Sequence, residues 1–233
     1  MSVRDGSFSR RQWLSACSAG LAVSTGLPGM AQVQGSQAEE GVSPAEDLMR
    51  EHGVLKRVLL IYRDVMRRID GKEDFPPDVL AGSARLIRDF IENYHEKLEE
   101  DYLFPRLRKA NRLVELVNTL ELQHQRGRVL TERVLQLASP SVLKDASRKQ
   151  HLRASLHLFV RMYEPHEARE DTVLFPAFHE IVSPREYDSL GDEFEEKENQ
   201  LFGAGGFEKN VEAVAALEKQ LGIYDLSQFT PEA

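Results

Sequence analysis

The chain has 233 residues, 41% of them hydrophobic, and a formal net charge of -8. This is enough for one domain of moderate size with its own hydrophobic core. Acidic and basic residues are interleaved along the sequence, so we expect no basic face and no nucleic-acid partner. The single cysteine, Cys17, lies near the N-terminus, so a metal in the rest of the chain must be bound by nitrogen and oxygen atoms.

The amino-acid usage after about residue 40 favours helices. Glycine and proline are sparse there, while Leu, Glu, Arg, Lys and Ala, which are good helix formers, are abundant. We therefore expect an all-α protein.

Residues 1–31 have the features of an export signal. Arg10 and Arg11, in the sequence Ser-Arg-Arg-Gln-Trp-Leu, resemble the bacterial twin-arginine motif, and a weakly apolar run of small residues follows as far as about Leu27. Small residues at positions 29 and 31 suit a signal peptidase, so we expect cleavage after Ala31 and a periplasmic location. The apolar run is too short and too rich in Ser and Gly to span a bilayer permanently.

Two other interpretations of this segment stay open. The sequence Leu-Ser-Ala-Cys, which ends at Cys17, resembles a lipoprotein box and would give a lipid-anchored N-terminus, although only two apolar residues separate it from the arginines. The segment could also be a disordered basic tail. Residues 32–42 follow as a polar linker.

Two predicted helices make the first half of the body. Ser43 to Glu46 form a capping box with proline at the first helical position, so a helix begins there. Its apolar residues recur every three or four positions, and Asp70-Gly71 ends it. A second helix begins at Phe75-Pro76-Pro77-Asp78 and runs to His95.

Two more helices complete the predicted bundle, which occupies residues 43–182. The third extends from about Asn111 to Ala138, and Ser139-Pro140 opens the fourth, which runs to His166. Together these four segments predict a four-helix bundle.

Residues 183–233 are predicted to form a helical extension. A capping box at Ser183 to Glu186 opens an acidic helix that ends at about Phe202. The glycine-rich stretch 203–206 then separates it from an amphipathic helix at 207–221. These glycines lack the Gly-Lys-Ser/Thr ending of a phosphate loop, so we interpret them as a hinge or helix stop.

The body contains an internal repeat. The sequence from His95 to Glu99, followed by Leu-Phe-Pro at 103–105, returns 71 residues later as His166 to Glu170, followed by Leu-Phe-Pro at 174–176. The lone histidines His52 and His124 are 72 residues apart. The four predicted helices therefore carry, in order, His, His-x-x-x-Glu, His and His-x-x-x-Glu.

This spacing suits metal ligation. Residues four apart on a helix are rotated by about 400° and lie about 6 Å apart along the axis, so the imidazole and the carboxylate point the same way. Two such helices, with one histidine from each remaining helix, give four imidazoles and two carboxylates. That set fits two divalent ions, with iron, manganese or zinc as candidates.

The same residues resemble the hemerythrin-like, HHE cation-binding family over about residues 43–181, and the tail from Gly203 to Pro231 resembles that of bacterial members. The resemblance implies an up-down-up-down four-helix bundle with two extra C-terminal helices. It implies a di-iron centre, with Glu99 and Glu170 as bridges. The implied ligands are His52, His95, Glu99, His124, His166 and Glu170.

One departure from the family limits the expected activity. Oxygen-carrying hemerythrins have a fifth histidine where this chain has Arg128, and their closing carboxylate is an aspartate five residues after its histidine, whereas Glu170 follows His166 by four. A more symmetric and more open site follows, which argues against reversible oxygen carriage and leaves room for redox or peroxide chemistry.

Other polar residues are expected to lie outside the ligand set. His157 faces off the stripe that contains His166, and His151 and His179 are too distant along the same helix to reach the site, so all three are interpreted as structural or exposed. Glu96 and Glu167 are expected to be solvated or hydrogen-bonded around the site. Tyr94 and Tyr163 are expected to pack in the core, with a hydrogen bond near the site as the alternative, and the acidic run 193–198 is interpreted as a solvated face.

The leading functional hypothesis is a non-haem di-iron protein of the cell envelope that binds or reacts with oxygen, peroxide or nitric oxide. A redox partner would then be needed for some of this chemistry. The alternatives are a di-iron oxidase or peroxidase with an organic substrate, an iron or zinc holder without redox chemistry, and a structural bundle that has lost its metal.

Overall fold

The structure is a computed structural model that describes residues 42–232. The predicted export signal at 1–31 and the linker up to residue 41 lie outside the described residues. The described part of the chain is all-helical and contains no strand, which confirms the all-α part of the predicted fold class. None of its helices is both long and apolar enough to cross a membrane.

The first long helix, α2 (Pro44–Gly71), begins where the capping box predicts. The Ser43 side chain accepts a hydrogen bond from the backbone N–H of Glu46. At the other end Lys72 adopts a left-handed conformation, φ 56°, and its N–H bonds back to the last turn. Between these caps the apolar stripe is buried, including Leu48, Leu55, Leu59 and Tyr62.

The second helical rod is longer than predicted and not purely α-helical. It consists of α3 (Pro77–Leu86), the π-helix η1 (Ile87–His95), α4 (Glu96–Leu98), the π-helix η2 (Glu99–Leu103) and α5 (Phe104–Lys109). The sequence places its end at His95, but the rod continues through Glu99 because nothing between these residues breaks a helix.

The third helix, α6 (Val114–Leu137), begins three residues later than predicted. The reason is local, because Asn111 and Leu113 both have positive φ angles, 52° and 51°, which a helix cannot include. These two residues make the turn between the second rod and α6.

The fourth rod begins at Ala146 and not at Ser139-Pro140, so that prediction is wrong. Residues 138–141 form a turn, the short 3-10 helix η3 (Val142–Lys144) follows, and the Asp145 side chain accepts from the N–H of Arg148 to cap the helix. The rod then runs through its three parts, α7 (Ala146–Arg169), the π-helix η4 (Glu170–Leu174) and α8 (Phe175–Ile181).

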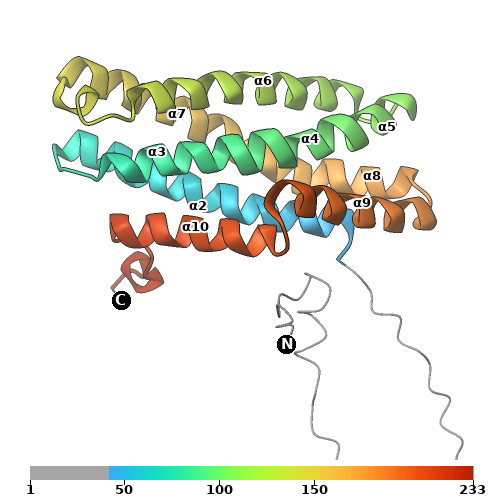
Figure 1. Cartoon of the computed structure of the whole chain (residues 1–233). Coiled ribbons are helices and arrows are strands. Elements are labelled where there is room, and N and C mark those ends of the chain that lie inside the picture. Colours follow the sequence, from blue (N-terminus) through green and yellow to red (C-terminus); the bar gives the residue numbers. More distant parts are fainter. Residues whose placement is uncertain (1–41, 233) are drawn as a thin grey trace, which may run out of the picture.

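The four rods lie side by side around a shared apolar core (Figure 1). Helix α2 packs on α7 and on η1, and α6 packs on α7 and on η1, so the two halves of the repeat occupy equivalent places. The metal-ligand candidates lie in the middle of this arrangement.

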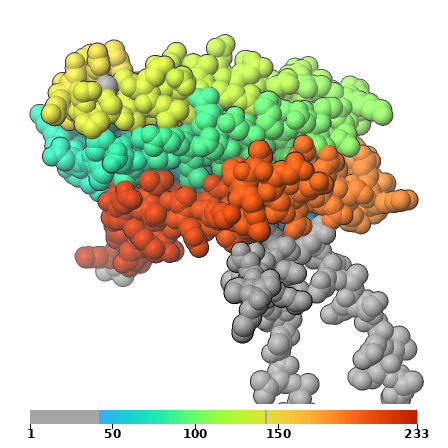
Figure 2. All heavy atoms as spheres, viewed as in Figure 1, coloured from blue at the N-terminus to red at the C-terminus, as the bar shows by residue number. Residues whose placement is uncertain are grey.

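The C-terminal extension covers one side of the bundle. Ser183 caps α9 (Pro184–Phe202) as predicted, and the hinge before α10 (Gly206–Leu221) contains Gly203 and Gly205 at φ 72° and 71°. A last 3-10 turn, η5 (Leu226–Phe229), follows. Helix α10 packs against α2 and α3, and α9 against α2. Figure 2 shows this extension, in orange and red, along one face of the molecule.

Candidate metal centre

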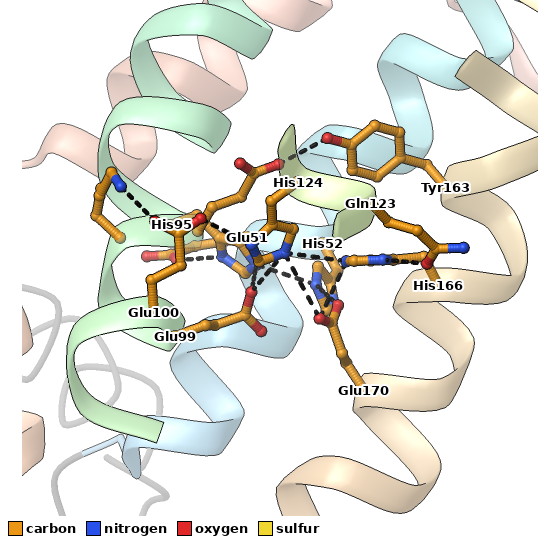
Figure 3. A network of polar contacts seen from close by, with 12 residues as sticks. Glu51, His52, His95, Glu99, Glu100, Gln123, His124, Tyr163, His166 and Glu170 are labelled. Carbon is orange, nitrogen blue, oxygen red and sulfur yellow. Dashed lines mark hydrogen bonds and ion pairs between the residues drawn. The ribbon is translucent and has the colours of Figure 1, made fainter. Parts of the chain in front are cut away.

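The structure brings all six sequence-predicted site residues together. His52 comes from α2, His95 and Glu99 from the second rod, His124 from α6, and His166 with Glu170 from the fourth rod. Each is between 0% and 3% exposed. Their side chains point toward one another in the interior of the bundle (Figure 3). They form two groups that could each hold an ion, namely His52, His95 and Glu99 in one, and His124, His166 and Glu170 in the other.

Each group contains a pair of imidazoles that meet through their Nε2 atoms. The Nε2 atoms of His52 and His95 are 3.0 Å apart, and those of His124 and His166 are 3.2 Å apart. Two nitrogens at about 2.1 Å from one ion lie about 3.0 Å apart on perpendicular bonds and about 3.4 Å apart on tetrahedral bonds. The two histidine pairs are therefore spaced as ligands of one ion each.

The two glutamates lie between the histidine pairs. Oε2 of Glu170 is 3.4 Å from Nε2 of His52, while its Oε1 is 3.0 Å from Nε2 of His166. Oε2 of Glu99 lies 3.4 Å from Nε2 of His124 and 3.8 Å from Nε2 of His95. Each carboxylate thus reaches both groups, which is the placement that a bridging ligand requires.

The carboxylate oxygens show that a cation fits this site. All four oxygens of Glu99 and Glu170 are buried, and their nearest polar neighbours are the inward Nε2 atoms of the histidines, with no other described group bonded to them. Burying carboxylates in this way is costly, and a metal ion shared with the imidazoles would offset this cost. Burial and the neighbouring Glu170 raise the pKa of Glu99 well above its usual value.

Comparison with known proteins agrees with this geometry. Residues 43–142 match the family model described as Hemerythrin HHE cation binding domain. Uncharacterized proteins of Mycobacterium tuberculosis and Mycobacterium bovis are each 48% identical to the chain over 219 residues, which cover 94% of this chain and 84% of the relative. The chain therefore contains a hemerythrin HHE cation-binding domain. No solved structure matches it significantly.

The second motif, His166 and Glu170, lies beyond the residues that the family model matches. The structure nevertheless brings it next to His124, with an Nε2–Nε2 distance of 3.2 Å between the two histidines that matches the 3.0 Å of the first half. For this HHE protein, the assignment of the second half of the site therefore depends on the internal repeat and on the geometry.

The outer nitrogen of every histidine has a polar partner, and sequence reasoning missed these partners. Nδ1 of each ring donates to an oxygen, so that the Nε2 lone pair faces the centre. The acceptors are Asp171 for His52 at 2.7 Å, Glu51 for His95 at 2.9 Å, Glu100 for His124 at 3.1 Å and Gln123 for His166 at 2.9 Å.

A signal for these partners was present in the repeat. Glu51 and Gln123 directly precede the lone histidines, and Glu100 and Asp171 directly follow the motif glutamates. Extending the comparison of the halves by one residue on each side would have found them. The halves also differ here, because three of the four acceptors are carboxylates and the fourth, Gln123, is a neutral amide.

Arg128 takes part in a charged network beside the site. Its guanidinium donates to Glu96 at 2.8 Å and to Glu100 at 2.6 Å. Lys56, 72 residues earlier, lies in the equivalent place beside Glu167 and Asp171, at 3.9 and 3.6 Å. Arg128 and Lys56 thus occupy equivalent places in the two halves, and each is a cation that pairs with carboxylates.

The structure decides between the alternatives left open for Glu96 and Tyr163. Glu96 is only 1% exposed, and the Tyr163 hydroxyl donates to its Oε1 at 2.6 Å. Tyr163 therefore hydrogen-bonds beside the site, and Glu96 is not a solvated residue. Burial raises the pKa of Glu96 to about 8, although the hydrogen bond from Tyr163 and the charge of Arg128 oppose this shift.

The phenylalanines of the two Leu-Phe-Pro sequences cover the site. Phe175 stacks on His52 with ring centroids 5.7 Å apart, and Phe104 stacks on His124 at 5.5 Å. Both are buried, so they help to exclude water from the imidazoles.

The three remaining histidines of the described chain, His151, His157 and His179, are exposed, as expected for residues outside the ligand set.

Proposed function

We propose that this HHE protein is an up-down-up-down four-helix bundle with two extra C-terminal helices that binds two iron ions and binds or reacts with oxygen, peroxide or nitric oxide. The observation that carries the proposal is the pair of histidine groups joined by two carboxylates. Glu170 places one oxygen near each group, at 3.4 Å from His52 and 3.0 Å from His166. Nitrogen and oxygen ligands in this proportion suit iron.

The six residues would divide between two metal positions. His52 and His95 would bind the first ion, His124 and His166 the second, and Glu99 with Glu170 would bridge them. Iron bound in this way supplies one-electron redox chemistry and coordination positions for a small ligand.

The surrounding residues prepare the site for such a ligand. The four Nδ1 acceptors hold the imidazoles in the orientation and tautomer that direct Nε2 inward. Phe104 and Phe175 shield the rings from bulk water. Protein side chains would then supply two imidazoles to each metal position, four in total, whereas an oxygen carrier has a fifth histidine. Fewer protein ligands leave more coordination positions open, which supports reaction with the small ligand over its reversible carriage.

The proposal is tested by isolating the protein without added metal. Elemental analysis should give two irons per chain, and the absorption spectrum should show charge-transfer bands that change when peroxide or azide is added. Zinc, or no metal at all, would contradict the iron assignment. Consumption of a candidate organic reductant with multiple turnovers would favour the oxidase or peroxidase alternative.

Three variants assign the ligands in the same experiment. His95→Ala and Glu170→Ala should both lower the iron content and the stability of the bundle, because they remove members of the set. His157→Ala is the matched control, since this histidine is exposed on the fourth rod. Retention of two irons in His95→Ala would refute the ligand set.

We also propose that the protein acts in the periplasm after twin-arginine export, on the support of the residues that surround Arg10 and Arg11. The test is the intact mass of the protein recovered from the cell envelope of a producing bacterium. Loss of residues 1–31 is the expected result. A double Arg10→Lys, Arg11→Lys chain should stay unprocessed inside the cell, whereas a lipid-modified N-terminus at Cys17 would support the lipoprotein alternative.

A further inference from the structure

A groove of about 490 Å³ lies on the outside of helices α6 and α7, a volume within the range of small-molecule sites. Helices α6 and α7 lie on the side of the bundle away from α10 (Figure 1). Five of the groove's lining residues come from α6, and the other three come from α7. They are Gln123, Arg126, Val129, Leu130, Arg133, Leu158, Arg161 and Met162.

The internal repeat allows this groove to be compared with the equivalent surface of the first half, which is a packing surface. Its equivalent in the first half is the groove between α2 and α3, which α10 fills. The residues there that correspond to Arg126, Arg133 and Arg161 are Val54, Ile61 and Phe90, and all three are buried. The second half therefore has three cations at positions where the first half has apolar contacts.

Within residues 42–232, the three arginines have no carboxylate as an ion-pair partner. Among the described residues, no carboxylate pairs with Arg126, Arg133 or Arg161, and no acidic side chain lines the groove. On the covered side, by contrast, Arg57 pairs with Glu218 of α10. In a chain of net charge -8, this is a local concentration of positive charge that still lacks its counter-charge.

The rest of the lining is apolar and accessible. Val129 and Leu158 are 45% and 50% exposed, and Leu130 and Met162 lie beside them. On α6, positions 126, 130 and 133 share one helical stripe, and on α7 positions 158, 161 and 162 share another. Arginine and apolar side chains thus alternate along both walls, which suits a ligand with an anionic head and an apolar body.

We propose that this groove binds a small organic anion with an apolar body, of the medium-chain carboxylate class. The arginines would bind the carboxylate through charge-assisted hydrogen bonds, and the chain would lie along Val129, Leu130 and Leu158. Gln123 lines the same groove and accepts from Nδ1 of His166 at 2.9 Å, so an occupant lies one side chain away from the proposed metal centre (Figure 3). Binding itself does not depend on metal.

The experiment is calorimetric titration of the full-length protein with decanoate, below its critical micelle concentration. We expect one saturable site, binding that weakens as salt is raised, and no comparable binding of decyltrimethylammonium. The double variant Arg126→Gln, Arg161→Gln should bind decanoate at least about tenfold more weakly, because it removes two of the charged hydrogen-bond donors to the carboxylate. Arg85→Gln, Arg185→Gln is the matched control and should bind normally, since both arginines are exposed and neither lines the groove.

A second variant separates the apolar part of the ligand from its charge. Leu158→Asp introduces an anion at an exposed position, so the fold is retained and decanoate binding should be lost. Circular dichroism of each variant checks the helix content. Equal binding of the cationic detergent, no binding of decanoate to the native chain, or unchanged binding in the arginine variant would each overturn the proposal. So would self-association that the arginine substitutions abolish without any decanoate binding, because the groove would then be an interface between copies.

Discussion

Arg128 donates at 2.6 Å to Oε1 of Glu100, the same oxygen that faces Nδ1 of His124. Burial alone would raise the pKa of Glu100. The hydrogen bonds of His124, Lys97 and Arg128, together with the charge of the arginine, outweigh burial and lower this pKa to about 2. Arg128 is therefore linked to His124 of the candidate metal centre through a carboxylate.

Replacing this arginine should destabilise the bundle. Arg128→Ala leaves the buried Glu96 and the largely buried Glu100 without their shared cation, which should cost about 2 kcal/mol after allowance for the partial exposure of the arginine. Urea unfolding of the metal-free protein measures this. Arg133 lies further along α6 and has no ion pair among the described residues. Arg133→Ala should therefore change the unfolding free energy by less than about 0.5 kcal/mol. Equal effects of the two substitutions would refute the network.

The hydroxyl of Tyr163 should contribute to stability, whereas that of Tyr62 should not. Tyr163→Phe removes the donor to the buried Glu96 and should cost about 1–3 kcal/mol in thermal or urea unfolding. The Tyr62 hydroxyl is buried without a hydrogen-bond partner among the described residues, so Tyr62→Phe should be neutral or stabilising. A larger loss in Tyr62→Phe than in Tyr163→Phe would contradict the hydrogen bond.

Gly127 should not tolerate a side chain. A Cβ atom there would lie 1.9 Å from the Tyr163 hydroxyl oxygen, so Gly127→Ala should cost about 1–3 kcal/mol by overpacking. Gly53, inside α2, has open space where its Cβ would be, and Gly53→Ala should stabilise the protein by about 0.5–1 kcal/mol through helix propensity. Differential scanning calorimetry of the two variants should show melting shifts of opposite sign.

Asp171 should control metal affinity without being a ligand. Asp171→Asn replaces the carboxylate that accepts from Nδ1 of His52, and such changes lower metal affinity by about 10–100-fold. Competition with a chelator gives the affinity of each variant. Asp101→Asn is the control. It removes the same charge from an exposed aspartate in the first half of the repeat. Loss of affinity in both variants alike would point to overall charge as the cause.

Features set by neighbouring residues could be predicted from the sequence. Ser43 and Ser183 cap helices where the capping boxes indicated, since these hydrogen bonds span only three residues. The start of the fourth rod was misplaced because Ser139-Pro140 and Asp145 offer competing starts, and the side-chain bond of Asp145 to Arg148 prevails.

The six ligand candidates could be found because the repeat fixes their order and the helical period fixes their direction. The acceptors of Nδ1 could not be derived from helical geometry. His52 and Asp171, for example, are 119 residues apart, and their contact depends on how α2 and the fourth rod pack. The groove on α6 and α7 was missed for the same reason, because its walls belong to two helices whose relative rotation is a property of the packed bundle.

The π-helical turns at Glu99–Leu103 and Glu170–Leu174 make the site sensitive to chain length as well as to residue type. A π turn holds more residues than an α turn. These segments therefore set the angle about the helix axis between Glu99 and Phe104, and between Glu170 and Phe175. Removal of a single residue here would restore α geometry and turn Phe104 or Phe175 away from its imidazole. One-residue deletions in these turns should therefore be as damaging as the loss of a ligand, even when every ligand is retained.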